Sequence, residues 1–202
     1  LRETHAKVVR VLSQALALSQ RYHVIIANPP YMGLKGMNSS IKAFAEVEYA
    51  EAKSDLYAMF IKRGLLLAVK NGFSAQITMH SWMFLPSYEE LRPYLRSRAR
   101  LITMAHLGPR AFDSISGEVV QTAAFVYSTG AREGHLSVYH RLVDGKSEEA
   151  KSRMLLNNEG RYTRTMESMN MIPGRPIIYW MSDGLMGAFE VGVPLENIAK
   201  PR

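Results

Sequence analysis

The sequence predicts an α/β fold, in which helices wind around a mostly parallel sheet and a hairpin adds an antiparallel edge. Three observations predict it. Short apolar runs rich in β-branched residues alternate with longer stretches of helical periodicity. The run at residues 22–27 is almost continuously apolar, as buried parallel strands are. Two later runs of this kind are separated by glycines, which is typical of a hairpin.

The first half of the chain supplies two predicted helices and two predicted strands. In order, these are an amphipathic helix over 1–20, a buried parallel strand over 22–27, a helix over 56–70 and a strand over 73–79, and a polar loop is expected over 32–40. Asp55 has the position of an N-cap for the second helix, and Asn71-Gly72 has that of a C-cap.

The second half continues the alternation before its pattern weakens. Ser87, with Glu90 three residues later, predicts the start of a helix that runs to about Arg98. Predicted strands follow over 101–107, 119–127 and 136–139, the last two joined around Gly130 and Gly134. From about Asp144 the sequence turns polar and weakly periodic. We therefore expect one domain over 1–143, then a linker and the start of a following domain over 144–202.

Composition narrows the function classes. The chain has no cysteine, which excludes disulfides and thiolate metal sites, and its six histidines lack metal-ligand spacing, so we expect no metal. It shows neither an apolar run of membrane length nor a signal peptide, so we expect a cytoplasmic protein without membrane contact. The formal net charge is +7. Arg92, Arg96 and Arg100 share one helical face, which fits either DNA phosphates or plain solvent.

The most informative motif is Asn28-Pro29-Pro30-Tyr31, directly after the first predicted strand. Ligands of open α/β sheets bind beyond the carboxyl ends of the strands, where this motif lies. The two prolines make the loop stiff, as a catalytic site requires. The alternative is a turn that merely ends a strand.

Methyl transfer to an exocyclic amine explains why these residue types would be needed. The lone pair of adenine N6 is delocalised into the ring, so the amine is a poor nucleophile. The amide oxygen of Asn28 and the carbonyl of Pro29 can each accept one N6–H, which frees the lone pair. Tyr31 offers a flat face on which a flipped base can stack.

The motif and the segments after it resemble adenine-N6 DNA methyltransferases. The similarity runs through 24–31, Ser54-Asp-Leu-Tyr57 with Phe60, 76–84 and 117–127. Together these segments resemble the PglX family of BREX phage-defence methyltransferases, which are relatives of combined restriction–modification enzymes. The resemblance implies that the chain forms the C-terminal half of the Rossmann-like sheet of a methyltransferase that uses S-adenosylmethionine.

The resemblance also implies roles for single residues. Asn28, Pro29 and Tyr31 would contact the target adenine, and Pro30 would keep the loop rigid. Tyr127, or else Phe125 on the same strand face, would close the other side of the base. Phe60 would pack near the cofactor, although it also fits a normal helix core. Asn28 and Asp55 are further candidates for cofactor contact, and Asp55 fits a helix cap better.

The implied cofactor is S-adenosylmethionine, and the implied partners are double-stranded DNA and other proteins of a phage-defence system. The Gly-rich cofactor loop that such enzymes place before the motif has no counterpart among the first 27 residues. We therefore expect a fragment that is inactive alone. Two alternatives stay open: methylation of a protein glutamine or an RNA base, and a non-catalytic DNA-binding module.

Overall fold

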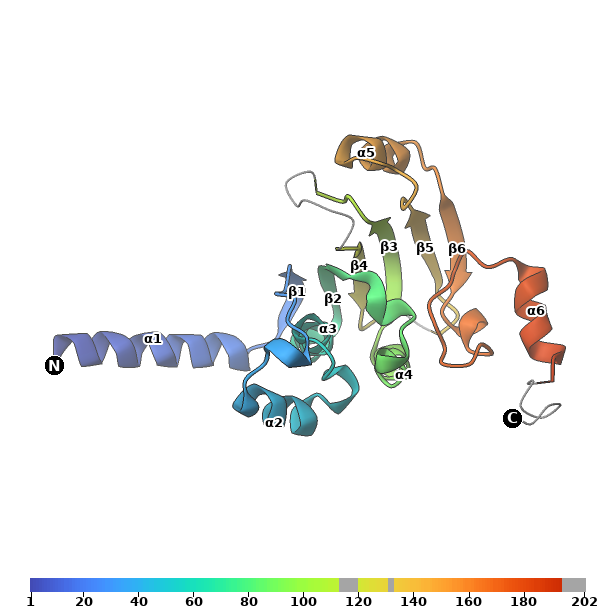
Figure 1. Cartoon of the computed structure of the whole chain (residues 1–202). Coiled ribbons are helices and arrows are strands. Elements are labelled where there is room, and N and C mark those ends of the chain that lie inside the picture. The colour runs from blue at the N-terminus through green and yellow to red at the C-terminus, as the bar shows by residue number, and fades with distance from the viewer. Residues whose placement is uncertain (113–119, 131–132, 194–202) are drawn as a thin grey trace.

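A computed structural model describes residues 1–112, 120–130 and 133–193, which build an open, mixed six-stranded sheet (Figure 1). The strand order is β1-β2-β4-β3-β5-β6. The strands are β1 (Tyr22–Ala27), β2 (Ala68–Met79), β3 (Arg100–Gly108), β4 (Thr122–Ser128), β5 (Leu136–Arg141) and β6 (Arg161–Thr165). β1 is parallel to β2 and β3 to β5, whereas β4 is antiparallel to both of its neighbours and β6 to β5.

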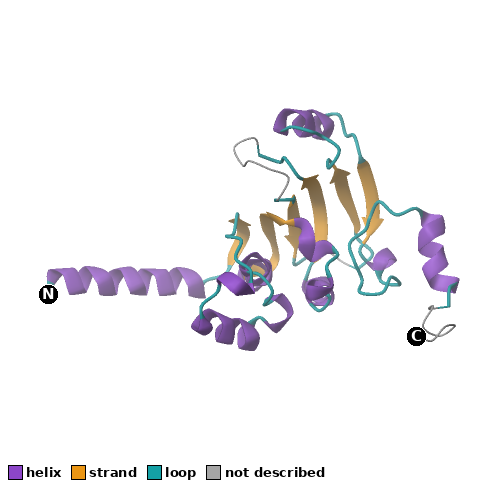
Figure 2. Ribbon diagram, viewed as in Figure 1, coloured by secondary structure: helices purple, strands orange, loops and turns teal. Residues whose placement is uncertain are grey.

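Within the described residues, six α-helices and five short 3₁₀ helices connect and flank these strands (Figure 2). The α-helices are α1 (Arg2–Ser19), α2 (Ser39–Glu48), α3 (Leu56–Leu67), α4 (Leu91–Arg98), α5 (Glu148–Leu156) and α6 (Asp183–Val191). The 3₁₀ helices are Leu34–Gly36, Ala50–Ala52, His80–Met83, Pro86–Tyr88 and Glu167–Met169.

The two faces of the sheet differ in burial. Along β2 and β4 buried and half-exposed side chains alternate, as the two-residue period of a strand requires. The buried face carries Gln76 and Phe125 and packs against α3 and the segment around Trp82. The other face carries small residues such as Ala75 and Ala124 and remains half-exposed. The main core therefore lies on one side of the sheet.

The predicted strands 22–27, 73–79 and 101–107 are confirmed, with two corrections. β1 is an edge strand rather than a buried one, and Val24 is 55% exposed, because only β2 pairs with it. β2 begins at Ala68, so the preceding helix ends at Leu67 instead of residue 70. Asn71, with φ 64°, does not cap that helix but kinks β2.

The predicted hairpin between the last two strands is wrong. β4 lies between β2 and β3, and β5 pairs with β3 on the far side. The antiparallel edge pair is instead β5 with β6. Val119, where the first strand of the hairpin was expected to begin, lies outside the described residues.

Two helix starts also differ from expectation. Ser87 lies within the 3₁₀ helix Pro86–Tyr88 and does not cap α4, whose N-cap position is Glu90. α2 was not predicted, and Asn38 caps it by accepting a hydrogen bond from Ile41 N–H. A polar residue precedes each of these helices, but only Asn38 forms a side-chain cap.

Residues 144–193 contribute to the same sheet and core. β6 extends the sheet, and Met166, Met169 and Tyr179 are buried in the main core. The domain boundary expected at residue 143 stays a prediction. Residues after this position pack into the same core as residues before it.

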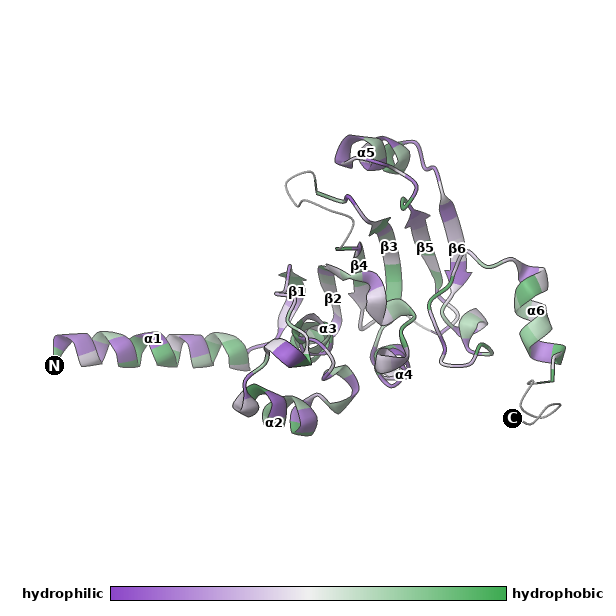
Figure 3. Ribbon diagram, in the orientation of Figure 1, coloured by the Kyte–Doolittle hydropathy of each residue, from purple (hydrophilic) through white to green (hydrophobic). Residues whose placement is uncertain are grey.

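The predicted N-terminal helix is confirmed as α1, which extends away from the sheet (Figure 1). None of its side chains is buried, although hydrophobic and hydrophilic residues alternate along it (Figure 3). Leu12 and Leu16, for example, are both exposed. No helix in the described ranges has the length and apolar character needed to cross a membrane.

Candidate active site

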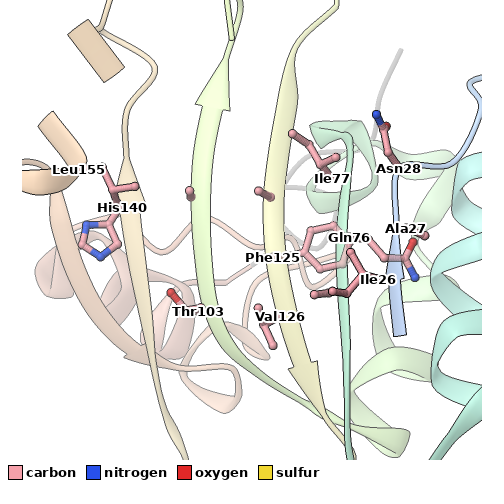
Figure 4. A pocket seen from close by; sticks show the side chains of 13 residues that line it. Ile26, Ala27, Asn28, Gln76, Ile77, Thr103, Phe125, Val126, His140 and Leu155 are labelled. Carbon is pink, nitrogen blue, oxygen red and sulfur yellow. The ribbon is translucent and has the colours of Figure 1, made fainter. Parts of the chain in front are cut away.

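Asn28 follows β1 at the carboxyl end of the strand, next to β2. The last paired residue of β1 is Ala27, opposite Gln76. The Asn28 side chain is exposed and borders an open hollow of about 490 Å³ over the half-exposed face of the sheet (Figure 4). The hollow is largely apolar, and Ile26, Ile77 and Val126 also line it. The carboxamide is therefore accessible from a cleft rather than packed in the core.

The rest of the loop alternates between the core and solvent. Pro29 is buried and Pro30 is exposed. The Tyr31 ring is 36% exposed and lies edge-on to the buried ring of Tyr57, with centroids 5.8 Å apart. Partial burial, together with the charge of Asp55, raises the pKa of the Tyr31 phenol, so this side chain is neutral at physiological pH. The loop thus presents a carboxamide and a neutral aromatic ring.

Asp55 is the N-cap of α3, as the sequence predicts. Its Oδ1 accepts hydrogen bonds from Tyr57 N–H at 3.2 Å and from Met32 N–H at 2.9 Å. The second bond reaches the residue directly after Tyr31. The carboxylate therefore serves the loop backbone as well as the helix, and its predicted contact with cofactor stays a prediction.

Phe60 lies on the exposed side of α3 and is 41% exposed. With Phe44 and Tyr49 it lines an apolar hollow of about 310 Å³ between α2 and α3. The neighbouring Met59 is buried in the core. Phe60 is thus free to contact a flat apolar group, and its predicted role near the cofactor stays a prediction.

Tyr127 and Phe125 are placed differently from expectation. Tyr127 is 1% exposed, and both rings pack against Trp82 on the buried face of the sheet. Two residues apart on one strand, they face the same way, toward the core. The buried Tyr127 ring has no free face for a flipped base, so the structure contradicts its predicted stacking role. Phe125 also lines the hollow beside Asn28, and its stacking role stays a prediction.

The arginine stripe on α4 is also corrected. Arg92 is buried and donates hydrogen bonds to the carbonyl oxygens of Gly174, Trp82 and Leu85. Arg96 donates to Asn170 Oδ1 and to the carbonyl of Arg175, while Arg100 pairs with Glu167. Helical spacing predicted one shared face, but α4 ends at Arg98 and Arg100 begins β3, and all three side chains contact residues 167–175. These guanidinium groups hold the fold together instead of facing phosphates.

A family model describing the Eco57I restriction-modification methylase matches residues 3–112. This range includes Asn28–Tyr31, Asp55 and Phe60. The chain belongs to the Eco57I restriction-modification methylase family.

Two curated relatives fit this family assignment. The adenine-specific methyltransferase BrxX of Escherichia coli O9:H4 (strain HS) is 46% identical over 189 residues, which are 93% of this chain and 16% of that protein. The adenine-specific methyltransferase PglX of Lacticaseibacillus casei (strain Zhang) is 42% identical over 172 residues, 82% of this chain and 14% of that protein. The resemblance to PglX is confirmed, and the chain spans 14–16% of the length of these relatives.

Solved structures confirm the methyltransferase fold. The DrdV–DNA complex matches with a TM-score of 0.61 at 15% identity, over 84% of this chain and 19% of that one. The methyltransferase subunit of a type I restriction-modification system from Streptococcus thermophilus matches with a TM-score of 0.56 at 14% identity, over 79% of this chain and 38% of that one. The expectation of a Rossmann-like methyltransferase sheet thus holds for this member of the Eco57I family.

Sequence reasoning missed one supporting residue of this Eco57I-family site. Tyr57 belongs to a segment that carries the family resemblance, but no role was predicted for it. Its ring contacts Tyr31, and its hydroxyl lies 2.8 Å from Ser81 Oγ. Its spacing of two residues from Asp55, at the start of a helix, was the available signal.

The histidines near the carboxyl edge of the sheet form a chain of contacts. His80 Nδ1 lies 2.7 Å from His106 Nε2, and His106 Nδ1 lies 3.1 Å from the Tyr179 hydroxyl. Burial lowers the pKa of both rings, so they are neutral at physiological pH. Within the described residues no cluster of three or more potential ligands could hold a metal ion.

Proposed function

We propose that this chain carries the catalytic loop of a longer DNA methyltransferase that modifies adenine at N6. The observation that carries the proposal is the exposed Asn28 carboxamide, fixed between a sheet strand and two prolines at the border of a cleft. The names of the two relatives and of the family support methylation of adenine within restriction–modification or phage defence.

The loop supplies hydrogen-bond acceptors of the kind the reaction needs. Asn28 Oδ1 and the Pro29 carbonyl oxygen each accept one hydrogen from adenine N6, which draws the nitrogen toward tetrahedral geometry and exposes its lone pair. Tyr31 stacks on the flipped base. These groups are held in place before the base arrives, so little reorganisation is needed. Transfer would break the S–CH₃ bond of the sulfonium as the N6–CH₃ bond forms, leaving a neutral thioether, and N6 would then lose a proton to solvent.

S-adenosylmethionine supplies the electrophilic methyl group when bound. Phe60 fits such a cofactor, because its partly exposed ring and the apolar hollow beside it can receive a flat heterocycle. We propose that the remaining cofactor contacts come from parts of the protein outside this chain. The 202 residues alone are then expected to bind the cofactor weakly and to be inactive.

Double-stranded DNA is the proposed substrate. Its target base has to be flipped out of the duplex to reach Asn28, and the energetic cost of flipping is a few kcal/mol. Interaction with other proteins of a phage-defence system remains a prediction from the family resemblance. We propose that the protein acts in the cytoplasm, where its DNA substrate lies.

Acceptor assays with the full-length protein test this proposal. Tritiated S-adenosylmethionine would be supplied with unmethylated duplex DNA, with RNA and with protein extract in parallel reactions. The proposal predicts transfer to duplex DNA, and a loss of about 100- to 1000-fold in Asn28→Ala, similar to removal of one preorganised hydrogen-bonding group elsewhere. The exposed Asn157→Ala serves as the matched control. Transfer to RNA or protein alone would overturn the proposal.

A further inference from the structure

We propose that Asp55 is a positioning residue for the catalytic loop, holding it through the backbone of Met32. The inference rests on the proposed function and assigns the means by which the loop keeps its shape. The loop Asn28–Tyr31 is largely exposed, and the residues directly before and after it are held by the fold.

The first fixed end is β1. Ala27 pairs with Gln76 of β2, so the sheet determines where Asn28 begins. The prolines restrict the backbone that follows but donate no hydrogen bonds, because they have no N–H. The prolines therefore limit the bending of the loop, and only the buried Pro29 adds packing contacts to the rest of the molecule.

The second fixed end is Met32, which is bound on both sides of its backbone. Its N–H donates to Asp55 Oδ1 at 2.9 Å, and its carbonyl oxygen accepts from Leu56 N–H at 3.0 Å. Gly33 then forms an isolated antiparallel bridge with Asp55. The start of α3 thus holds the chain directly after Tyr31.

One carboxylate oxygen links the two structures. The same Oδ1 that accepts from Met32 also caps α3 by accepting from Tyr57 N–H at 3.2 Å. α3 is anchored in the core by the buried Tyr57 and Ile61. The helix therefore fixes the position of the loop through this oxygen. A hydrogen bond to a carboxylate is also stronger than one between neutral groups.

Loss of this hydrogen bond would affect catalysis because a catalytic site tolerates only small displacements of its groups. Preorganised groups have to stay within about 0.5 Å of their productive positions. Without the Asp55 carboxylate, the loop would keep β1, the buried Pro29, the ring contact to Tyr57 and the single bond from Leu56 N–H to the Met32 carbonyl, while Met32 N–H would lose its acceptor. Displacement of the loop would slow methyl transfer more than it would weaken DNA binding.

Three substitutions in the full-length protein separate capping from anchoring. Asp55→Asn keeps an acceptor oxygen of the same reach and serves both bonds. Asp55→Ser remains a good N-cap for α3, but its hydroxyl is one bond shorter and does not reach Met32 N–H. Asn38→Ser likewise replaces a helix cap, that of α2, by serine and is the matched control.

The readouts are the single-turnover rate of methyl transfer, the dissociation constant for duplex DNA and the melting temperature. We expect Asp55→Ser to lower the rate about 100-fold, as a misplaced reacting group does, while its DNA affinity and melting temperature stay near those of the unmodified protein. Asp55→Asn and Asn38→Ser should keep the rate. A normal rate in Asp55→Ser, or equal losses in both Asp55 variants, would overturn the proposal.

Hydrogen exchange of the unmodified full-length protein provides a test without any variant. Within Asn28–Met32 only Asn28, Tyr31 and Met32 have backbone N–H groups. The anchor predicts that Met32 N–H exchanges slowly, and exchange at the rate of an open loop would refute it. If the protein transfers no methyl group to DNA, the proposed function fails while this readout still decides on the anchor. If Asn28→Ala abolishes transfer and Asp55→Ser does not, only the anchor fails.

Discussion

The ring of Tyr31 meets the ring of Tyr57 almost at right angles, with centroids 5.8 Å apart and planes inclined by 82°. Tyr57 is fully buried, and its hydroxyl is held by Ser81. The exposed ring that we assign to base stacking therefore rests on a ring that the core keeps in place. The contact gives the loop a side-chain support in addition to the backbone bond at Met32.

Substitution of Tyr57 should distinguish its ring from its hydroxyl. Tyr57→Phe keeps the support for Tyr31 and loses one hydrogen bond, so we expect a loss of about 1 kcal/mol in stability and a near-normal rate. Tyr57→Leu removes the aromatic contact and should slow methyl transfer about tenfold or more, because Tyr31 can then tilt. Single-turnover kinetics and thermal unfolding of the full-length protein measure both effects. Equal rates in the two variants would contradict the supporting role.

Phe60 and Met59 are neighbours on α3 and both line the apolar hollow, but Met59 is 4% exposed and Phe60 is 41% exposed. Phe60 is partly exposed beside an apolar hollow, so Phe60→Ala should raise the KM for S-adenosylmethionine about tenfold while changing the melting temperature little. Met59→Ala, in the core, should cost about 2–5 kcal/mol of stability. Should Phe60→Ala leave the cofactor KM unchanged, the assigned role of Phe60 would be wrong.

Arg92 and Arg98 test the structural role of the basic helix. Arg92→Ala removes a donor from the carbonyl oxygens of Gly174, Trp82 and Leu85, of which that of Leu85 keeps a second donor in Tyr88 N–H, and we expect a loss of roughly 3 kcal/mol. Arg98 is exposed and lies 5.4 Å from the ring centre of Tyr94, so Arg98→Ala should cost less than about 1 kcal/mol. Thermal unfolding compares them. Comparable stability of the two variants would show that Arg92 is not the anchor the structure indicates.

The buried histidines predict a stability that falls in acid. Burial, with smaller contributions from His80 and nearby cationic side chains, lowers the pKa of His106 to about 3. The unfolded chain binds this proton near pH 6.5, whereas the folded chain does not until about pH 3. Stability should therefore decrease as the pH falls through this window, by up to about 1.4 kcal/mol per pH unit from His106.

Unfolding measured between pH 7 and pH 4 checks this slope. His106→Gln should flatten it, since glutamine does not titrate, and the same exchange at the exposed His5 should not. A slope that is the same in both variants would mean that His106 titrates normally in the folded protein.

The sequence was sufficient to predict features that depend on local pattern. The strands around Val24, Ile77 and Met104, the cap at Asp55 and the position of Asn28 beyond a strand all follow from short-range periodicity and residue type. The carboxyl end of a strand is a fixed place in an open sheet, so the motif could be assigned to the active edge without knowledge of the strand order.

Features that depend on distant pairing were not predictable in this way. Nothing near Gly130 indicates that β4 inserts between β2 and β3, so the local turn signal suggested a hairpin. The i, i+4 spacing of Arg92 and Arg96 reveals a shared face but not that residues 167–175 cover it. Asn71 favours positive φ both at the end of a helix and within a kinked strand. Tyr127 was misjudged because strand alternation does not tell which face is buried.

The most direct test is product analysis of DNA treated with the full-length protein, with and without Asn28→Ala. Duplex DNA from a strain without adenine methylation would be digested to nucleosides and analysed by mass spectrometry after reaction with S-adenosylmethionine. We predict N6-methyladenine with the unmodified protein and a loss of at least about 100-fold with Asn28→Ala. Equal amounts of N6-methyladenine from both proteins would contradict the role assigned to the Asn28 carboxamide.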